Sequence, residues 1–156
     1  IRDIVKRGYT KEKILETLKA REQDSKDFIE SQSKYADIII SPRPLHPISE
    51  IGSASEGLEL AFDLLMSNSI YLEHVIEDLY PIAGLTVSQS YLEGDQQKIS
   101  IHGSASSGEI AEVANNHIPG LFDLGVDYPK WPDDAFGVTI LLLTYFIFEA
   151  AEYGKE

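Results

Sequence analysis

The sequence predicts an α+β fold, and three observations support this prediction. The composition, with 43% hydrophobic and 25% charged residues, is that of an ordinary globular protein. Apolar residues recur at helical spacing in several segments of the 156-residue chain, including both ends. Other short segments alternate apolar and polar residues, which is the pattern of strands with one face in water. Helices and hairpin-connected strands in a chain of this length favour an α+β domain.

Charge divides the chain into two unequal parts. The formal net charge is −13, which disfavours nucleic acid and anionic membranes as partners. Residues 1–44 hold ten of the 13 basic residues and eight of the 26 acidic ones, so they carry +2 against −15 for the remainder. An anionic ligand is therefore expected at the front, and the rear is expected to be structural or to contact another subunit.

The absence of cysteine limits the available chemistry. With no cysteine in the sequence, disulfides, thiolate metal sites and cysteine nucleophiles are excluded. This fits a reducing compartment, so we expect a cytoplasmic protein, or one of the plastid stroma in a photosynthetic eukaryote. The chain begins at Ile1 and not at Met, from which we expect a processed chain or a fragment.

The front of the chain is predicted to be helical up to about Gln32. A first helix ends at Gly8, and Thr10 is a good N-cap for a second helix. The apolar stripe of the second helix consists of Ile14, Leu15 and Leu18. The β-branched run at residues 36–40 then predicts a short buried strand, which Pro42, Pro44 and Pro47 end as a connector.

The rear of the chain alternates strand and helix signals. Ser106 and Glu109 form a capping-box pattern, and either Asp133 or Asp134 is expected to cap the last helix. The predicted elements are a strand over 58–64, a helix over 70–80, a hairpin over 85–92 and 97–102, a helix from 106 and a helix over about 135–151. The apolar run 136–148 is shorter than the roughly 20 residues that cross a bilayer, so we expect a buried helix and no membrane span.

The rear offers weak site signals, each with a simpler structural explanation. The four histidines are scattered without metal-ligand spacing, and His117 is expected to be a satisfied core residue. The Gly/Ser-rich segment 103–108 is expected to be a turn and a helix cap, because no Lys follows its second glycine. Ser100 or Ser104 beside His102 lacks the motif of a nucleophile.

A succession of short motifs in the front segment resembles the phosphoribulokinase/uridine kinase family. The motifs are Arg2-Asp3 with Arg7-Gly8-Tyr9-Thr10, then Arg21 and Asp24, Phe28-Ile29 with Gln32, and Tyr35-Ala36-Asp37-Ile38-Ile39-Ile40. Their order and spacing match over about the first 40 residues, with Ser31 where the family usually has proline. Tyr9-Thr10 and the long tail resemble phosphoribulokinases more than uridine kinases.

The resemblance implies phosphoryl transfer from ATP to ribulose 5-phosphate, as in the Calvin cycle. Arg2 and Arg7 match arginines of the family's lid, near the sugar phosphate and the transferring group. A guanidinium suits this place because it stays charged and grips phosphate oxygens with a planar fork. Arg21 also matches a family arginine, and Lys6 lies near enough to help bind phosphate. The alternative is that Arg7 pairs only with Asp3 and that Arg2 is a solvated helix residue.

The family's phosphate loop, GxxxxGK[ST], does not occur in this sequence. We therefore expect the C-terminal half of a P-loop α/β kinase, inactive alone, with no catalytic residue or metal ligand in it. ATP and Mg²⁺ would be bound mainly by the missing half. Residues 1–44 would be lid helices and the last, parallel core strand, and 45–156 an antiparallel α+β extension at the subunit contact of a homodimer. The alternatives are a kinase of uridine or another sugar phosphate, and a non-catalytic dimerisation or regulatory module.

Overall fold

The computed structural model describes a sheet, three α-helices and part of the front segment. The described residues are 10, 13, 16–17, 19–21, 25, 30–46, 59–119, 121 and 130–153. The predictions for residues 1–9, including the first helix, and for Pro47 and Leu58 lie outside the described residues.

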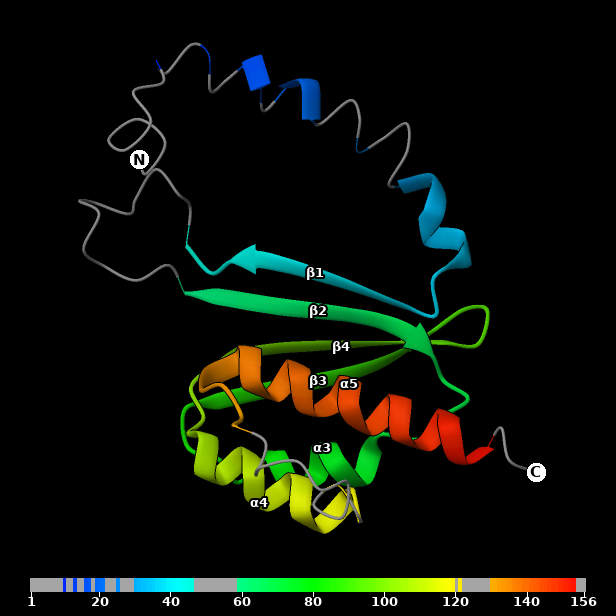
Figure 1. Cartoon of the computed structure of the whole chain (residues 1–156), viewed down its shortest axis with the longest axis vertical. Helices are drawn as coiled ribbons and strands as arrows, with labels where there is room; N and C mark the ends of the chain where they lie inside the picture. Colours follow the sequence, from blue (N-terminus) through cyan, green and yellow to red (C-terminus); the bar gives the residue numbers. More distant parts are fainter. Residues whose placement is uncertain are drawn as a thin grey trace.

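Four antiparallel strands form one sheet in the order β1-β2-β4-β3 (Figure 1). Their bounds are β1 Ile38–Pro44, β2 Leu60–Ser67, β3 Leu85–Leu92 and β4 Gln96–Gly103. The predicted alternation of buried and exposed side chains is confirmed in β2. Phe62, Leu64 and Met66 are buried, while Asp63 and Leu65 between them are partly exposed. The central pair β2 and β4 therefore carries the core face of the sheet.

The hairpin of β3 and β4 is confirmed at its predicted place. Gly94 and Asp95 at its tip have φ angles of 78° and 56°. Glycine adopts this left-handed region without steric cost, and Asp is among the residues that tolerate it. The turn chemistry therefore fixes the register, in which Tyr91 lies opposite Gln97 and Val87 opposite Ile101.

The prediction for β1 is wrong in three respects. The strand pairs antiparallel with β2 and not as a parallel strand. It runs through Pro42 and Pro44, which were expected to form the connector after it. It is partly or fully exposed, because it lies at the edge of the sheet, and only Ile38 at its start is given as packed against the core among its described residues. Proline is compatible with an edge strand, where one side of the backbone needs no partner.

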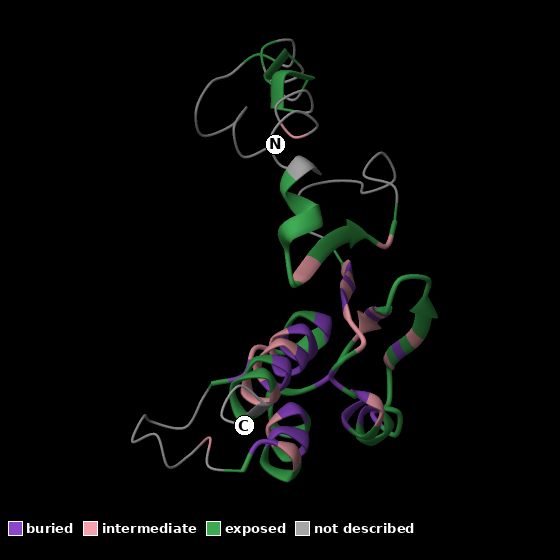
Figure 2. Cartoon of the chain, turned by 90° about the vertical axis from the view of Figure 1, so that its right-hand side faces the viewer, coloured by how far each residue is buried: buried purple, intermediate pink, exposed green. Residues whose placement is uncertain are grey.

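Three α-helices cover one face of the sheet, and the core lies between them (Figures 1 and 2). Their bounds are α3 Glu73–Leu79, α4 Ser107–His117 and α5 Asp134–Tyr153, and a 3₁₀-helix, η2, covers Glu30–Tyr35. α5 crosses β2 and β4 and contacts α4, while α3 contacts α4 and β3. Figure 2 shows buried residues concentrated in this half, whereas η2 and β1 are mainly exposed.

The start of α5 is fixed to the start of α4. The predicted capping box is present, because Ser106 Oγ accepts from Glu109 N and the Glu109 carboxylate accepts from Ser106 N. The Asp133 carboxylate accepts a hydrogen bond from Ser107 N at 2.7 Å, so it serves the first turn of α4 in addition to preceding α5. Asp133 also stands at the start of α5, as one of the two predicted caps, because its carbonyl oxygen accepts from Gly137 N at 3.3 Å. Its side chain, however, bonds to the other helix, because the tertiary fold brings the start of α4 within its reach.

α5 is longer than its apolar run predicted. It has 20 residues, and among the described residues it is the one helix long and apolar enough to span a bilayer by length and composition. In the fold, 44% of its most apolar window is buried inside the protein. Val138, Leu141 and Leu142 are fully buried in the core, while Phe136 and Ile147 on its flank are 50% and 64% exposed.

Candidate functional site: the front segment and its junction with the sheet

Of the four predicted phosphate-binding residues, Arg2, Lys6 and Arg7 lie outside the described residues. Arg21 lies in a helical stretch and its side chain is exposed. The helix start predicted at Thr10 is confirmed, since Thr10 Oγ1 accepts from Lys13 N at 3.3 Å. The side chain of Arg21 is thus accessible to an anionic ligand. That Arg21 binds the same phosphate as Arg2 and Arg7 stays a prediction.

The front segment reaches the sheet through η2 and β1. Ala36 N donates to Ser33 O at 3.2 Å, which closes the last turn of η2 before β1 begins. The Lys34 ammonium lies 4.9 Å from the centre of the Tyr35 ring, and Tyr35 is 80% exposed. All seven residues of β1 then pair with β2. The end of the front segment therefore has a fixed place relative to the core.

An ionic cluster on the sheet face without helices ties β1 to β2 and β4. Asp63 accepts from Ser100 Oγ at 2.6 Å, and its other oxygen lies 3.3 Å from Arg43 Nε and 3.2 Å from Lys98 Nζ. Burial raises the pKa of the Asp63 carboxyl, but the hydrogen bonds from Ser100 and Lys98 and the charges of Lys98 and Arg43 outweigh this effect, so the pKa lies below its ordinary value. Ser100 therefore donates to a carboxylate whose lowered pKa makes it a weak base, which does not favour Ser100 as a nucleophile.

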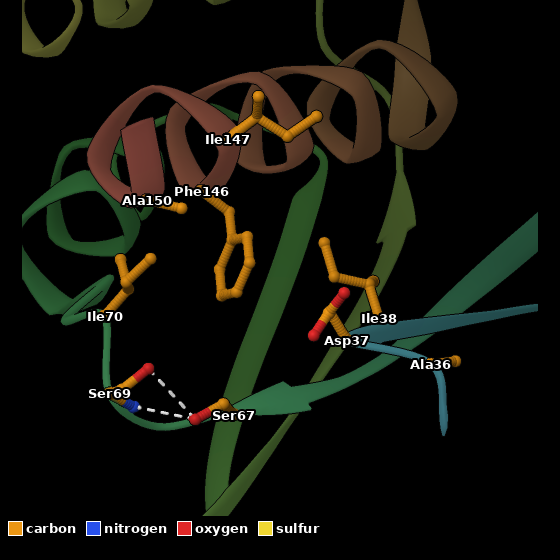
Figure 3. Close-up of a pocket in the computed structure, with 9 residues that line it drawn as sticks. All are labelled: Ala36, Asp37, Ile38, Ser67, Ser69, Ile70, Phe146, Ile147 and Ala150. Atoms are coloured by element: carbon orange, nitrogen blue, oxygen red, sulfur yellow. Dashed lines mark hydrogen bonds between the residues drawn. The ribbon is translucent and has the colours of Figure 1, made fainter. Parts of the chain in front are cut away.

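Two hollows lie between β1 and α5, one at each end of the helix. The first has a volume of about 1010 Å³ and is walled by the start of β1, the β2–α3 connection and the last turns of α5. In Figure 3, Phe146 points into it from α5, with Asp37 and Ile38 on the opposite wall. The second, about 990 Å³, lies where β1 ends and α5 begins, beside Pro42 and Phe136.

The described lining of the two hollows is acidic and does not suit a bare triphosphate. The described residues that line the two hollows include Asp37, Glu59, Asp133 and Asp134 and no basic side chain. A triphosphate needs cations and backbone donors, whereas these carboxylates would repel it. Across the described part of the chain, no group of three or more His, Asp or Glu side chains is arranged to hold a metal ion.

The histidines of the helical layer are satisfied by protein partners. His117 on α4 lies 2.8 Å from the Asp78 carboxylate, and His74 Nε2 lies 2.8 Å from the hydroxyl of Tyr145. The two imidazole rings are 5.2 Å apart. His117 was expected to be a satisfied core residue: its protein partner is confirmed, but the residue is only partly buried. Together these side chains form a polar contact among α3, α4 and α5. Sequence spacing gave no signal for this contact, because its members come from three separate helices.

The comparisons with known proteins match the front of the chain. The model of the Phosphoribulokinase / Uridine kinase family matches residues 1–49, a segment that contains η2 and β1 as well as Arg2, Lys6, Arg7 and Arg21. No curated protein and no solved structure matches the chain. The resemblance inferred from the motifs is thus confirmed: over residues 1–49, the chain is similar to the phosphoribulokinase/uridine kinase family.

Proposed function

We propose that this chain is part of an ATP-dependent phosphotransferase whose acceptor is ribulose 5-phosphate. The observation that carries the proposal is the family match at residues 1–49, which coincides with the basic third of the chain. A kinase must hold several phosphate groups together while charge spreads over the transferring group. Residues 1–44 have a net charge of +2, whereas the whole chain has a net charge of −13, so these residues are the part suited to that task.

Arg2 and Arg7 would hold phosphate oxygens of the sugar phosphate and the transferring group. Each guanidinium keeps its charge and offers two parallel donors, which matches the planar edge of a phosphate. Arg21 and Lys6 would add positive charge around the same ligand. ATP and Mg²⁺ would be bound by residues outside this chain, because the 156 residues contain no GxxxxGK[ST] sequence.

The rear of the chain would serve as the base that carries these arginines. The front segment ends in a strand with a complete ladder to β2, and Arg43 on that strand contacts Asp63. A catalytic segment fixed at one end loses less conformational entropy when it orders around its ligand. A homodimer built on the rear, in the cytoplasm or plastid stroma, belongs to the same proposal.

Two alternatives remain. The first is a kinase of uridine or another sugar phosphate, which would keep the same arginines and change the acceptor pocket. The second is a non-catalytic dimerisation or regulatory module at residues 45–156, which the charge boundary near residue 44 favours.

The deciding experiment is an assay of ADP release by the protein encoded by the complete reading frame. With ATP and Mg²⁺, we expect turnover with ribulose 5-phosphate and little with uridine. Turnover with uridine alone would support the first alternative. No turnover with either acceptor, from a protein that unfolds cooperatively, would contradict the proposal and support the second.

A further inference from the structure

Two histidine rings from different helices lie beside each other in the helical layer. His74 belongs to α3 and His117 to the last turn of α4, and the centres of their rings are 5.2 Å apart. The two helices lie side by side in Figure 1 and are in contact. Because the hairpin of β3 and β4 separates the two helices in the sequence, no spacing pattern could reveal this pair.

One nitrogen of each ring is held by a protein partner. His117 Nε2 lies 2.8 Å from the Asp78 carboxylate, and His74 Nε2 lies 2.8 Å from the Tyr145 hydroxyl. With the proton on Nε2 of both rings, these two oxygens accept it and each Nδ1 offers a lone pair. Histidines that bind metal ions in proteins are typically oriented in this way, by a hydrogen bond to the ring nitrogen that does not bind the metal.

The second nitrogen of each ring is open to the solvent. Among the described residues, neither His74 Nδ1 nor His117 Nδ1 has a hydrogen-bond partner. His74 is exposed, and the side chain of His117 is 14% exposed. No buried side-chain nitrogen or oxygen of the described residues lacks a partner, so His117 Nδ1 is in reach of water. An ion can therefore approach both nitrogens from the solvent.

The separation of the rings fits two ligands of one ion. In a tetrahedral zinc site the Zn–N distance is about 2.0 Å, which places the centres of two bound imidazole rings about 5 Å apart. The separation of 5.2 Å between the rings of His74 and His117 agrees with this value. Their planes are inclined by 48°, so the two rings are not stacked face to face.

The surroundings of the pair are acidic, which favours a cation. Asp78 also lines a hollow of about 390 Å³ between α3 and α4, together with Glu109 and Glu112. The described residues that line this hollow include no basic side chain. Residues 45–156 carry a net charge of −15, and an acidic surface raises the local concentration of cations.

We propose that His74 Nδ1 and His117 Nδ1 bind one divalent transition-metal ion, such as Zn²⁺ or Ni²⁺, which joins α3 to α4. Imidazole is a preferred ligand of these ions, whereas Mg²⁺ prefers oxygen ligands. The described residues place no third His, Asp or Glu in a metal-binding group with the pair, so water completes the coordination. The sequence contains no cysteine that would compete for the ion. The inference is independent of the proposed kinase function.

Zinc titration of the full chain tests the proposal. The protein is prepared without a histidine tag and treated with a chelator, and Zn²⁺ binding is followed by calorimetry and by the midpoint of thermal unfolding. We expect saturable binding of one ion per chain and a higher midpoint, because an ion that binds only the folded chain stabilises it. Mg²⁺ should change neither. Absence of saturable binding at one Zn²⁺ per chain would overturn the proposal.

His74→Gln and His117→Gln identify the ligands. Each substitution should weaken Zn²⁺ binding at least about tenfold, and urea unfolding without metal checks that each variant still folds. His46→Gln and His102→Gln are the matched controls, because these histidines lie outside the pair, and both should bind Zn²⁺ like the wild type. Equal weakening by all four substitutions would mean adventitious binding to surface histidines and would contradict the site.

Tyr145→Phe tests the orientation of the His74 ring. The variant keeps the aromatic ring and removes the hydroxyl, so Zn²⁺ binding should weaken by about 10–100-fold although both ligands remain. Histidine ¹⁵N spectra of the wild type should show the ion on Nδ1 of both rings. Coordination through Nε2, or wild-type affinity in Tyr145→Phe, would count against the proposed geometry.

Discussion

Asp63 is the residue on which three strands of the sheet converge. It lies on β2 and contacts Arg43 of β1 and both Lys98 and Ser100 of β4. Its side chain is only 19% exposed, so water replaces these contacts poorly. Because Arg43 belongs to the segment that matches the kinase family, this carboxylate also fixes the base of that segment.

Replacing Asp63 by Asn should destabilise the chain in a pH-dependent way. The folded pKa of Asp63 is depressed, so its stabilising effect is fully present above the unfolded pKa and is lost as pH falls through the folded pKa. At pH 7 we expect the variant to lose about 1–2 kcal/mol in the free energy of unfolding. Urea unfolding between pH 7 and pH 3 should show the difference shrinking below about pH 4.

Asp37→Asn is the matched control for this series. Asp37 is an exposed carboxyl outside the Asp63 cluster, so its loss should change the free energy of unfolding little at any pH. A deficit of Asp63→Asn that stayed constant down to pH 3 would mean that packing, and not charge, causes it.

At the scale of elements, the joint between α4 and α5 organises the helical layer. The Asp133 carboxylate reaches the first turn of α4, and Asp134 N donates to Ala105 O at 2.7 Å. A Cβ atom built on Gly137 would collide with the Pro132 carbonyl and lie 2.7 Å from Ile110 Cδ1. The first turn of α5 therefore lies so close to the backbone of the segment before it that only glycine fits, and it also lies close to Ile110 of α4.

Gly137→Ala should destabilise the chain although alanine is the better helix former. Propensity alone would add up to about 1 kcal/mol of stability. The collision with a backbone carbonyl should outweigh this gain and give a net loss of about 1–3 kcal/mol. Gly108→Ala on α4 is the control, because its Cβ would meet only Ser106 Oγ at 3.9 Å and should be neutral or stabilising. Thermal unfolding that ranks the two variants in the opposite order would refute this description of the joint.

Ser106→Ala should remove the capping box of α4. The variant leaves Glu109 N without its side-chain acceptor, and we expect a loss of about 1 kcal/mol in urea unfolding. Ser107→Ala next to it keeps the backbone N–H that donates to Asp133 and should change stability little. Equal losses in the free energy of unfolding from both variants would show that the Ser106 hydroxyl does not stabilise the start of α4.

At the scale of the whole molecule, charge and structure divide at nearly the same place. The basic segment ends with β1, and the remainder carries the sheet centre, the helices and a net charge of −15. Catalytic groups are commonly placed on segments that a rigid scaffold positions. This division agrees with our proposal that the front segment binds phosphate and that the rear supports it.

Arg7→Ala should impair phosphoryl transfer by the complete protein. If Arg7 holds phosphate in the transition state, kcat/KM should fall by the equivalent of about 2 kcal/mol or more. Arg7→Lys should recover only part of the loss, because an ammonium lacks the planar fork. Lys34→Ala, an exposed charge removed on η2, should leave kcat/KM near wild type. Wild-type kcat/KM for Arg7→Ala would contradict the role of the lid arginines.

The elements that the sequence predicted well are those whose signals are local. The hairpin depends on Gly94-Asp95 and the alternation beside it, and the start of α4 depends on Ser106 and Glu109 three residues apart. Thr10 as an N-cap is of the same kind. The motifs of the front segment likewise predicted the family match, because family motifs are read directly from residue order.

Only the tertiary structure decided the place of β1, the partner of Asp133 and the contacts of Asp63. The direction and burial of a strand depend on which distant strand supplies its hydrogen bonds and on whether a helix covers its face. The composition of residues 36–40 therefore predicted a buried strand, whereas the strand lies at an exposed edge of the sheet. Asp133 and Asp63 likewise find partners 26 and 37 residues away. Short-range patterns carry backbone preferences, whereas these contacts are set by the packing of elements that are remote in the chain.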